Sequence, residues 1–129
     1  MFQNLDVFRL SHAMAVHAGT RQSVVAQNLA NADTPGYKAR DVPAFTTLMD
    51  ADTRVFSAKA TRATHLNMSA GPLQIDISPR EAAQTDPDGN SVSLETEMLH
   101  AVDVKRQHDR AIAIYKSALG VLRTAVSVR

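Results

Sequence analysis

The chain changes character at the stretch Asn28-Leu29-Ala30-Asn31-Ala32-Asp33-Thr34-Pro35-Gly36-Tyr37-Lys38. Before this stretch, apolar residues recur at helical spacing and no proline interrupts them. Within it, Pro35 presets φ for the second position of a type II turn, and Gly36 supplies the positive φ that the third position requires. Thr34 precedes a proline, so the α region is disfavoured for it. We therefore expect a long helix to end near residues 32–33 and a tight turn to redirect the chain.

Upstream of the turn, residues from about 5 to 32 are expected to form this helix. Its apolar side chains make a narrow stripe with one polar break at Arg21 and Gln22. Val24 and other apolar residues fall off the stripe, so more than one face of the helix is expected to be covered. A helix of about 28 residues is about 42 Å long and cannot bury such a stripe against itself. The stripe consists of Val7, Leu10, Met14, Ala18, Val25, Leu29 and Ala32.

A second long helix is expected to follow Ser93, which is a favourable N-cap residue. From Leu94, apolar residues recur at alternating steps of four and three, the heptad spacing of a coiled-coil seam. Lys105 and His108 interrupt this seam, so uniform pairing of the two helices along their whole length is not expected. A helix of about 34 residues extends about 50 Å. The seam positions are Leu94, Met98, Ala101, Lys105, His108, Ile112, Tyr115, Leu119, Leu122 and Val126.

Between the two helices the sequence predicts a small irregular insert that contains β structure. Residues 37–49 show no sustained period and are interpreted as extended chain. Gly71-Pro72 marks a turn into residues 73–77, where apolar and polar residues alternate as in a half-buried strand. One strand is unstable alone, so it needs a partner, either residues 37–42 or a neighbouring subunit. A tight turn at Asp88-Gly89 is then expected ahead of the last helix.

The predicted fold class is therefore mainly α, with two long terminal helices that form a coiled-coil-like pair. We divide the chain into an N-terminal helix at residues 1–33, an insert at residues 34–92 and a C-terminal heptad helix at residues 93–129. Both termini together are expected to build one assembly domain. Long amphipathic helices of this kind gain most of their stability from packing partners rather than from propensity.

The composition excludes several classes of function. Among the 129 residues, 44% are hydrophobic but only 5% are aromatic, which favours aliphatic helices over a β-sandwich. A net charge of +1 gives no electrostatic case for nucleic acid. The absence of cysteine removes disulfides, thiolate metal sites and cysteine nucleophiles. No apolar run approaches the roughly 20 residues of a membrane-spanning helix, and an ordinary cleaved secretory signal is not expected.

No catalytic, cofactor-binding or metal-binding residue is predicted. Neither the pair His12 and His17 nor the pair His100 and His108 has the spacing of ligands on one helix face, so the histidines are expected to be exposed or between subunits. The carboxylates from Asp86 onward echo a calcium loop, but its turn position holds serine instead of glycine. No nucleophile elbow or phosphate-binding glycine loop is present. We expect the amides of Asn28 and Asn31 to satisfy backbone groups around the turn at Pro35-Gly36.

The turn stretch closely resembles the N-terminal signature of the axial proteins of the bacterial flagellum, the rod and hook family. The match is nearly continuous over the eleven residues 28–38. It extends to the pattern Asp88-Gly89-Asn90-x-Val92 and to Glu97-Met98 ahead of and within the last helix. The length of the chain is that of the short proximal-rod members of this family. The signature residues are Asn28, Leu29, Ala30, Asn31, Thr34, Pro35, Gly36 and Tyr37.

The resemblance implies a structural subunit of the proximal rod, in which the terminal helices form a tube that transmits torque and passes exported subunits. It also implies copies of the chain, other rod proteins and the adapter to the membrane ring as partners, and export by the flagellar type III apparatus into the periplasm-spanning rod. The alternative is a soluble coiled-coil adaptor or chaperone-like module. Replacing Asn31 or Gly36 with alanine is expected to impair assembly. Subunit packing is expected from Val25, Leu29, Leu94, Met98, Ile112, Tyr115, Leu119, Leu122 and Val126.

Overall fold

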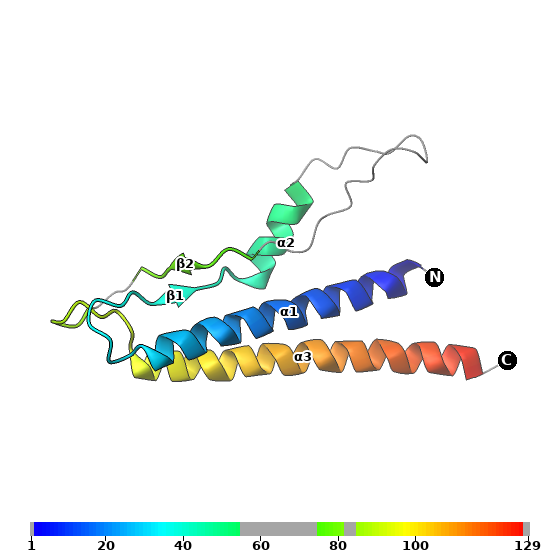
Figure 1. The fold of residues 1–129 in the computed structure, drawn as a ribbon. Coiled ribbons are helices and arrows are strands. Elements are labelled where there is room, and N and C mark those ends of the chain that lie inside the picture. Colours follow the sequence, from blue (N-terminus) through cyan, green and yellow to red (C-terminus); the bar gives the residue numbers. More distant parts are fainter. Residues whose placement is uncertain (1, 55–74, 82–84, 128–129) are drawn as a thin grey trace.

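The structure is a computed structural model that describes residues 2–54, 75–81 and 85–127. It confirms the mainly α fold class, with two long terminal helices packed against each other and a small strand-containing insert between them (Figure 1). The elements are helix α1 (Phe2–Ala30), strand β1 (Arg40–Asp41), helix α2 (Phe45–Arg54), strand β2 (Ser78–Pro79) and helix α3 (Leu94–Ser127).

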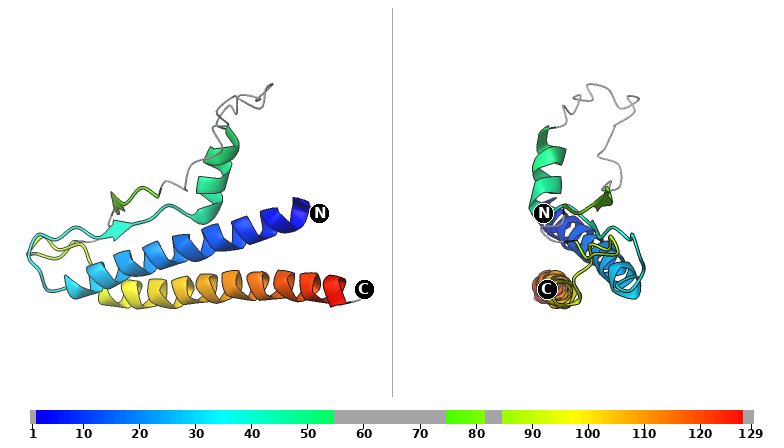
Figure 2. Two further views of the ribbon diagram at one scale, coloured as in Figure 1. Left: turned by 45° about the vertical axis from the view of Figure 1, so that its right-hand side comes forward. Right: turned by 90° about the vertical axis from the view of Figure 1, so that its left-hand side faces the viewer.

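Helices α1 and α3 lie side by side and antiparallel, so the N- and C-terminal ends of the chain lie together at one end of the molecule (Figure 2). The buried contact between them centres on Ala18 and Val25 of α1 and Val104 of α3. Toward the termini the helices diverge, and there Phe8 meets Tyr115 edge to face, with ring centroids 5.2 Å apart. The pairing is therefore tightest at the end where α1 leads into the signature turn.

The face of α3 that packs against α1 differs from the predicted seam. Its buried residues are Glu97, Val104 and Ala111, which repeat every seven positions but begin one residue before Met98. One residue corresponds to a rotation of about 100° around the helix. The predicted seam followed the hydrophobic positions of the sequence. The face that packs against α1 instead includes the buried Glu97, so Met98 remains exposed. Lys105 interrupted the predicted seam, but it does not interrupt the face that packs against α1, because Val104 occupies the buried position there.

The insert lies against a second face of α1, at the off-stripe residue Val24. Val24 is buried together with Val42 and Ala39 of the insert. The ring of His17 is also buried, and its Nε2 lies 2.8 Å from the carbonyl oxygen of Pro43. The expectation that the histidines are exposed or between subunits is therefore wrong for His17.

Helix α2 corrects the interpretation of residues 37–49 as extended chain. Phe45, Leu48 and Met49 are spaced as i, i+3 and i+4, which is the signature of one helical face and was missed because the segment is short. Leu48 donates its backbone N–H to Ala44, which closes the first turn. The helix rises away from the α1–α3 pair (Figure 1). The ring of Phe45 lies 5.5 Å from that of His17, centroid to centroid.

The predicted strand at residues 73–77 is displaced along the chain. Residues 75–77 are not in a strand, residues 73–74 lie outside the described part, and the pairing occurs at β2. Strand β2 runs antiparallel to β1 with Arg40 opposite Pro79, so the predicted partner segment at residues 37–42 is confirmed. The register is set by Arg80, whose backbone N–H donates to Ala39 and whose side chain reaches α3. Pro79 has no N–H to donate, which keeps the ladder short.

The turn that ends α1 has the predicted form. Tyr37 donates its N–H to the carbonyl of Thr34, and Gly36 has φ of 72°. Helix α1 itself ends at Ala30, two to three residues before the predicted end, because residues 31–34 already form hydrogen-bonded turns.

Gly36 and Gly19 lie in different backbone environments, so replacing each with alanine is expected to change the stability of the chain in opposite directions. Gly36→Ala is expected to destabilise the chain by about 1 kcal/mol, because a β-carbon disfavours positive φ. Gly19→Ala, in the exposed middle of α1 with open space around it, is expected to stabilise by about 0.5–1 kcal/mol. Urea denaturation followed by circular dichroism measures both changes. Equal effects of the two substitutions would contradict the assignment of strain to Gly36.

Candidate functional site

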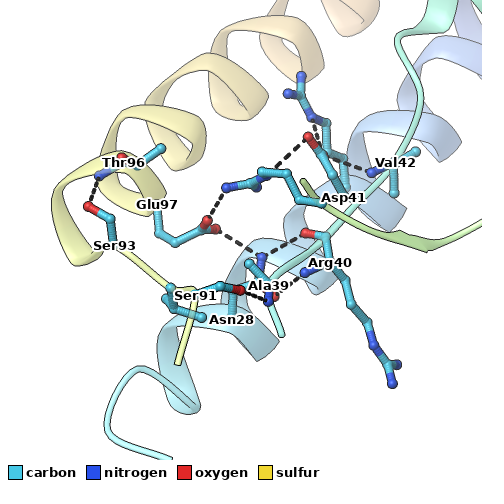
Figure 3. Close-up of polar contacts among 12 residues, drawn as sticks. Asn28, Ala39, Arg40, Asp41, Val42, Ser91, Ser93, Thr96 and Glu97 are labelled. Carbon is cyan, nitrogen blue, oxygen red and sulfur yellow. Dashed lines mark hydrogen bonds and ion pairs between the residues drawn. The ribbon is translucent and has the colours of Figure 1, made fainter. Parts of the chain in front are cut away.

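A partly buried polar cluster joins the two terminal helices to the insert at the end where they pair most closely. We call it the junction, and it consists of Asn28, Tyr37, Asp41, Arg80, Asn90 and Glu97. It begins with Asn28, which is fully buried in the last full turns of α1. The side-chain Nδ2 donates to the carbonyl of Arg40 at 2.8 Å, and Oδ1 accepts the N–H of Arg40 at 3.0 Å (Figure 3). The amide therefore binds the returning chain as a neighbouring strand would.

Asn28 also reaches two further groups of the junction. Its Oδ1 accepts a hydrogen bond from the Tyr37 hydroxyl at 3.3 Å, and its Nδ2 lies 3.2 Å from Glu97 Oε2 on α3. One amide side chain thus holds the turn, the first strand and the last helix together. The backbone groups that Asn28 binds therefore belong to Arg40, beyond the turn at Pro35-Gly36.

Glu97 is the charged centre of the junction and is fully buried. Its Oε1 accepts a hydrogen bond from Arg80 Nη1 at 2.7 Å, while Oε2 faces Asn28. The guanidinium of Arg80 also approaches Asp41, with 3.5 Å between Nε and Oδ2. Arg21 of α1 lies on the other oxygen of Asp41, at 3.7 Å. Two carboxylates and two guanidinium groups therefore alternate from α3 through the insert to α1, which compensates the buried charge.

Asn90 closes the other side of the junction, in the loop ahead of α3. Its buried Nδ2 lies 3.0, 2.6 and 3.0 Å from the carbonyl oxygens of residues 31, 32 and 34. Its Oδ1 accepts the N–H of Val92 at 2.8 Å. Carbonyl groups at the end of a helix lack partners within the helix. Asn90 supplies that partner to the turn after α1 from a loop nearly sixty residues later.

The signature turn and the loop at residues 85–93 pack backbone to backbone. Gly36 donates its N–H to the carbonyl of Asp88, and Ser91 donates its N–H to the carbonyl of Tyr37, both at 3.0 Å. Gly89 has φ of 85°, and a β-carbon on it would lie 3.5 Å from Gly36. The predicted tight turn at Asp88-Gly89 is confirmed by the hydrogen bond from the N–H of Gly89 to the carbonyl of Asp86 at 2.8 Å.

The contacts of the junction hold the two helices and the insert together, which is a structural role. Most of its polar groups bond to one another or to the backbone, whereas Nε and Nη2 of Arg80 are buried without a hydrogen bond. Within residues 2–54, 75–81 and 85–127 no group of three or more metal-ligating side chains is found. In the same residues, no helix is both long enough and apolar enough to cross a membrane. On the exposed side of α3, a hydrogen bond from Arg106 lowers the pKa of Asp103. That pair is solvent-exposed, so it contributes little to stability.

Comparison with known proteins agrees with the resemblance of the turn. The model of the family described as flagella basal body rod protein matches residues 17–38. The flagellar basal body rod protein FlgB of Agrobacterium fabrum is 33% identical over 124 residues, covering 89% of this chain and 88% of the relative. FlgB of Escherichia coli is 34% identical over 101 residues, covering 72% of each chain. FlgB of Cereibacter sphaeroides is 28% identical over 116 residues.

The chain belongs to the FlgB family of flagellar basal body rod proteins. FlgB proteins are structural proteins and not enzymes, so the chain is a structural subunit of the flagellar basal body rod. It assembles with other rod components in the basal body. The alternative of a soluble coiled-coil adaptor is not favoured.

The FlgB-family signature residues divide into two groups in the structure. Asn28 and Tyr37 enter the junction, whereas Leu29, Ala30, Thr34, Pro35 and Gly36 lie exposed on the surface. Asn31 is half-buried and bonds within its own turn, to the carbonyl of Gln27 and to the Thr34 hydroxyl. The expected role of Asn31 in holding the turn is thus local, while Asn28 makes the contacts to β1 and α3.

The residues predicted for subunit packing differ in how far they are exposed in the single chain. Val25 is in the core of this chain. Three others, Ile112, Leu119 and Leu122, are half-buried. The exposed ones are Leu29, Leu94, Met98, Tyr115 and Val126.

Sequence reasoning missed Glu97, Arg80, Asp41 and Asn90 as members of the junction. Glu97 and Asn90 were noticed as imperfect calcium ligands and as part of the family resemblance, but not as contacts between the helices. Their partners Asn28 and residues 31–34 lie 69 and 56–59 residues away along the chain. The available signal was the resemblance to the rod and hook family at Asp88-Gly89-Asn90 and at Glu97, which accompanied the turn signature.

Proposed function

We propose that the chain is a subunit of the proximal rod, assembling through its terminal helices into the tube that transmits torque and passes exported subunits. The observation that carries this proposal is the apolar surface that α3 leaves uncovered. Seven large apolar side chains of α3 are exposed in the single chain, and long helices of this kind gain most of their stability from packing partners. They are Leu94, Met98, Leu99, Val102, Tyr115, Val121 and Val126.

The junction supports a mechanical role. An element that transmits torque must resist bending where its helices meet the rest of the subunit. Hydrogen bonds that Asn28 and Asn90 donate, and others that Glu97 accepts, link α1, the insert and α3 in a buried environment, where satisfied bonds rigidify a structure. The subunit would therefore enter the rod with its helix pair already fixed at one end.

We also propose which proteins the chain contacts and how it is exported. Copies of the chain, related rod proteins and the adapter between the rod and the membrane ring would contact the exposed side of the helix pair. The flagellar type III apparatus would export the chain, without a cleaved signal peptide, to the part of the rod that spans the periplasm. Residues 1–33 and 93–129 would form the assembly domain, and residues 34–92 the insert.

Mass spectrometry of purified, detergent-resistant hook–basal bodies from the source cell tests the proposal. The chain is expected there at a few copies per particle. A strain carrying Met98→Asp, which places a charge on the exposed face, is expected to lose assembly although the isolated chain keeps its helicity. Recovery of the unmodified chain only in the soluble cytoplasmic fraction would overturn the proposal.

A further inference from the structure

Near the junction, α3 turns a largely polar face toward α1. Glu97 and Val104 are the buried residues of that face. The half-buried residues between positions 94 and 107 are all polar, namely His100, Asp103 and Gln107. Burial of apolar surface is the main force that packs helices together, so the packed side of a helix is normally its apolar side. This part of α3 has the opposite arrangement.

The exposed side of the same turns carries an apolar ridge, which consists of Leu94, Met98 and Val102. These residues follow one another at steps of four, so they lie along one side of the helix. They are 49%, 56% and 58% exposed. One residue corresponds to about 100° around the helix axis, so Met98 lies about 100° from Glu97. A turn of α3 by that angle would bury the ridge against α1.

We propose that Glu97 is a positioning residue that locks α3 in its observed rotation and so keeps the apolar ridge exposed. Its carboxylate accepts hydrogen bonds from Arg80 at 2.7 Å and from Asn28 at 3.2 Å (Figure 3). Asn28 is itself fixed by both backbone groups of Arg40. Turning α3 by 100° would withdraw the carboxylate from both partners, and separating a buried ion pair is costly.

A lock of this kind has a physical precedent in coiled coils. There, one buried polar residue fixes the register of two helices at a cost in stability. Glu97 would fix the rotation of α3 in the same way, against the hydrophobic gain that burial of the ridge offers. The lock acts within the single chain and does not depend on the proposed function, so either can fail while the other stands.

The reactivity of single cysteines measures the rotation, because the chain has no cysteine of its own. Met98→Cys places a thiol on the ridge, and Val104→Cys places one in the buried face. With the junction intact, the thiol at position 98 is expected to react with a maleimide at least about tenfold faster than the thiol at position 104, since a buried group reacts only after local opening.

The unlocked variant carries Arg80→Ala and Glu97→Ala, which removes both charges of the buried pair and leaves neither without its partner. In this variant the order of the two rates is expected to reverse, because α3 turns its ridge toward α1 and moves position 104 out of the interface. Loss of stability without rotation accelerates both reactions instead. Acceleration at both positions, or an unchanged order, would overturn the proposal.

The matched control carries Glu95→Ala and Arg106→Ala, which removes one carboxylate and one guanidinium from exposed positions of α3. This variant is expected to keep the fast reaction at position 98 and the slow reaction at position 104. A reversal in the control would show that the rotation does not depend on Glu97.

Lys105→Leu gives a second measurement. Lys105 is exposed in the observed rotation, and it follows the buried Val104, so the proposed turn carries it into the interface. The substitution is expected to raise the midpoint of urea denaturation in the unlocked variant, where the leucine becomes buried, and to leave it nearly unchanged when the junction is intact. It also stabilises the unlocked variant for the labelling. An equal shift of the midpoint in both backgrounds would contradict the rotation.

Discussion

Replacing Glu97 with alanine is expected to lower the free energy of unfolding by about 3–5 kcal/mol, because removing one partner of a buried ion pair leaves the other charge uncompensated. Glu97 is fully buried and holds both Arg80 and Asn28. The side chain of Arg80 is 21% exposed and keeps Asp41 nearby, which lets it recover part of the lost interaction. We therefore expect the lower half of that range. Urea denaturation followed by circular dichroism measures the change.

Glu95→Ala is the matched control, because Glu95 is an exposed carboxylate in the same first turn of α3. It loses only its interaction with the helix dipole, worth about 0.3–1 kcal/mol. Glu97→Gln keeps the shape and a hydrogen-bond acceptor for Asn28 while removing the charge, so it should fall between the two. Equal destabilisation by Glu95→Ala and Glu97→Ala would show that the junction does not hold the helices together.

A double-mutant cycle separates the ion pair from the rest of the junction. If Arg80 acts through Glu97, the double variant Arg80→Ala with Glu97→Ala should be less destabilised than the sum of the two single variants. Residues in one hydrogen-bond network commonly show interaction energies of about 0.5–3 kcal/mol. Additive effects would mean that Arg80 stabilises the insert through Asp41 alone.

The features predicted from the sequence are those that local signals determine. The periodicity of the terminal segments, the cap at Ser93 and the turn at Pro35-Gly36 each depend on residues within a few positions of one another, and the structure contains all of them. The partner segment of the short strand was also identified, although the strand itself lies a few residues later. These signals determined the fold class and its connectivity.

The junction could not be derived in this way, because its contacts join residues far apart in the sequence. A hydrophobic pattern treats glutamate as exposed, so Glu97 shifted the predicted face of α3 by one residue away from Val104. The partners of Asn90 could not be predicted either, because no residue near it in the sequence indicates that its amide binds the turn after α1. Buried polar side chains take their partners from the tertiary structure, which local periodicity does not encode.

Replacing Asn90 with alanine is expected to destabilise the chain by about 2–4 kcal/mol. The substitution removes the donor shared by three carbonyl groups after α1 and the acceptor for the N–H of Val92, and each net hydrogen bond is worth about 0.5–1.5 kcal/mol. Asn31→Ala is the control, because its amide bonds within its own turn on the surface. That substitution should cost less than about 1 kcal/mol.

Asn90→Asp is a stricter test than Asn90→Ala, because aspartate keeps the size of the asparagine side chain and its acceptor oxygen. The carboxylate would still accept the N–H of Val92, but it would place negative charge against the three carbonyl oxygens that Nδ2 now binds. We expect it to be at least as destabilising as alanine in urea denaturation. A nearly neutral Asn90→Asp together with a costly Asn90→Ala would mean that Val92 is the important partner. The turn after α1 would then be held by Asn28 and by the backbone contacts between Gly36 and Asp88, not by Asn90.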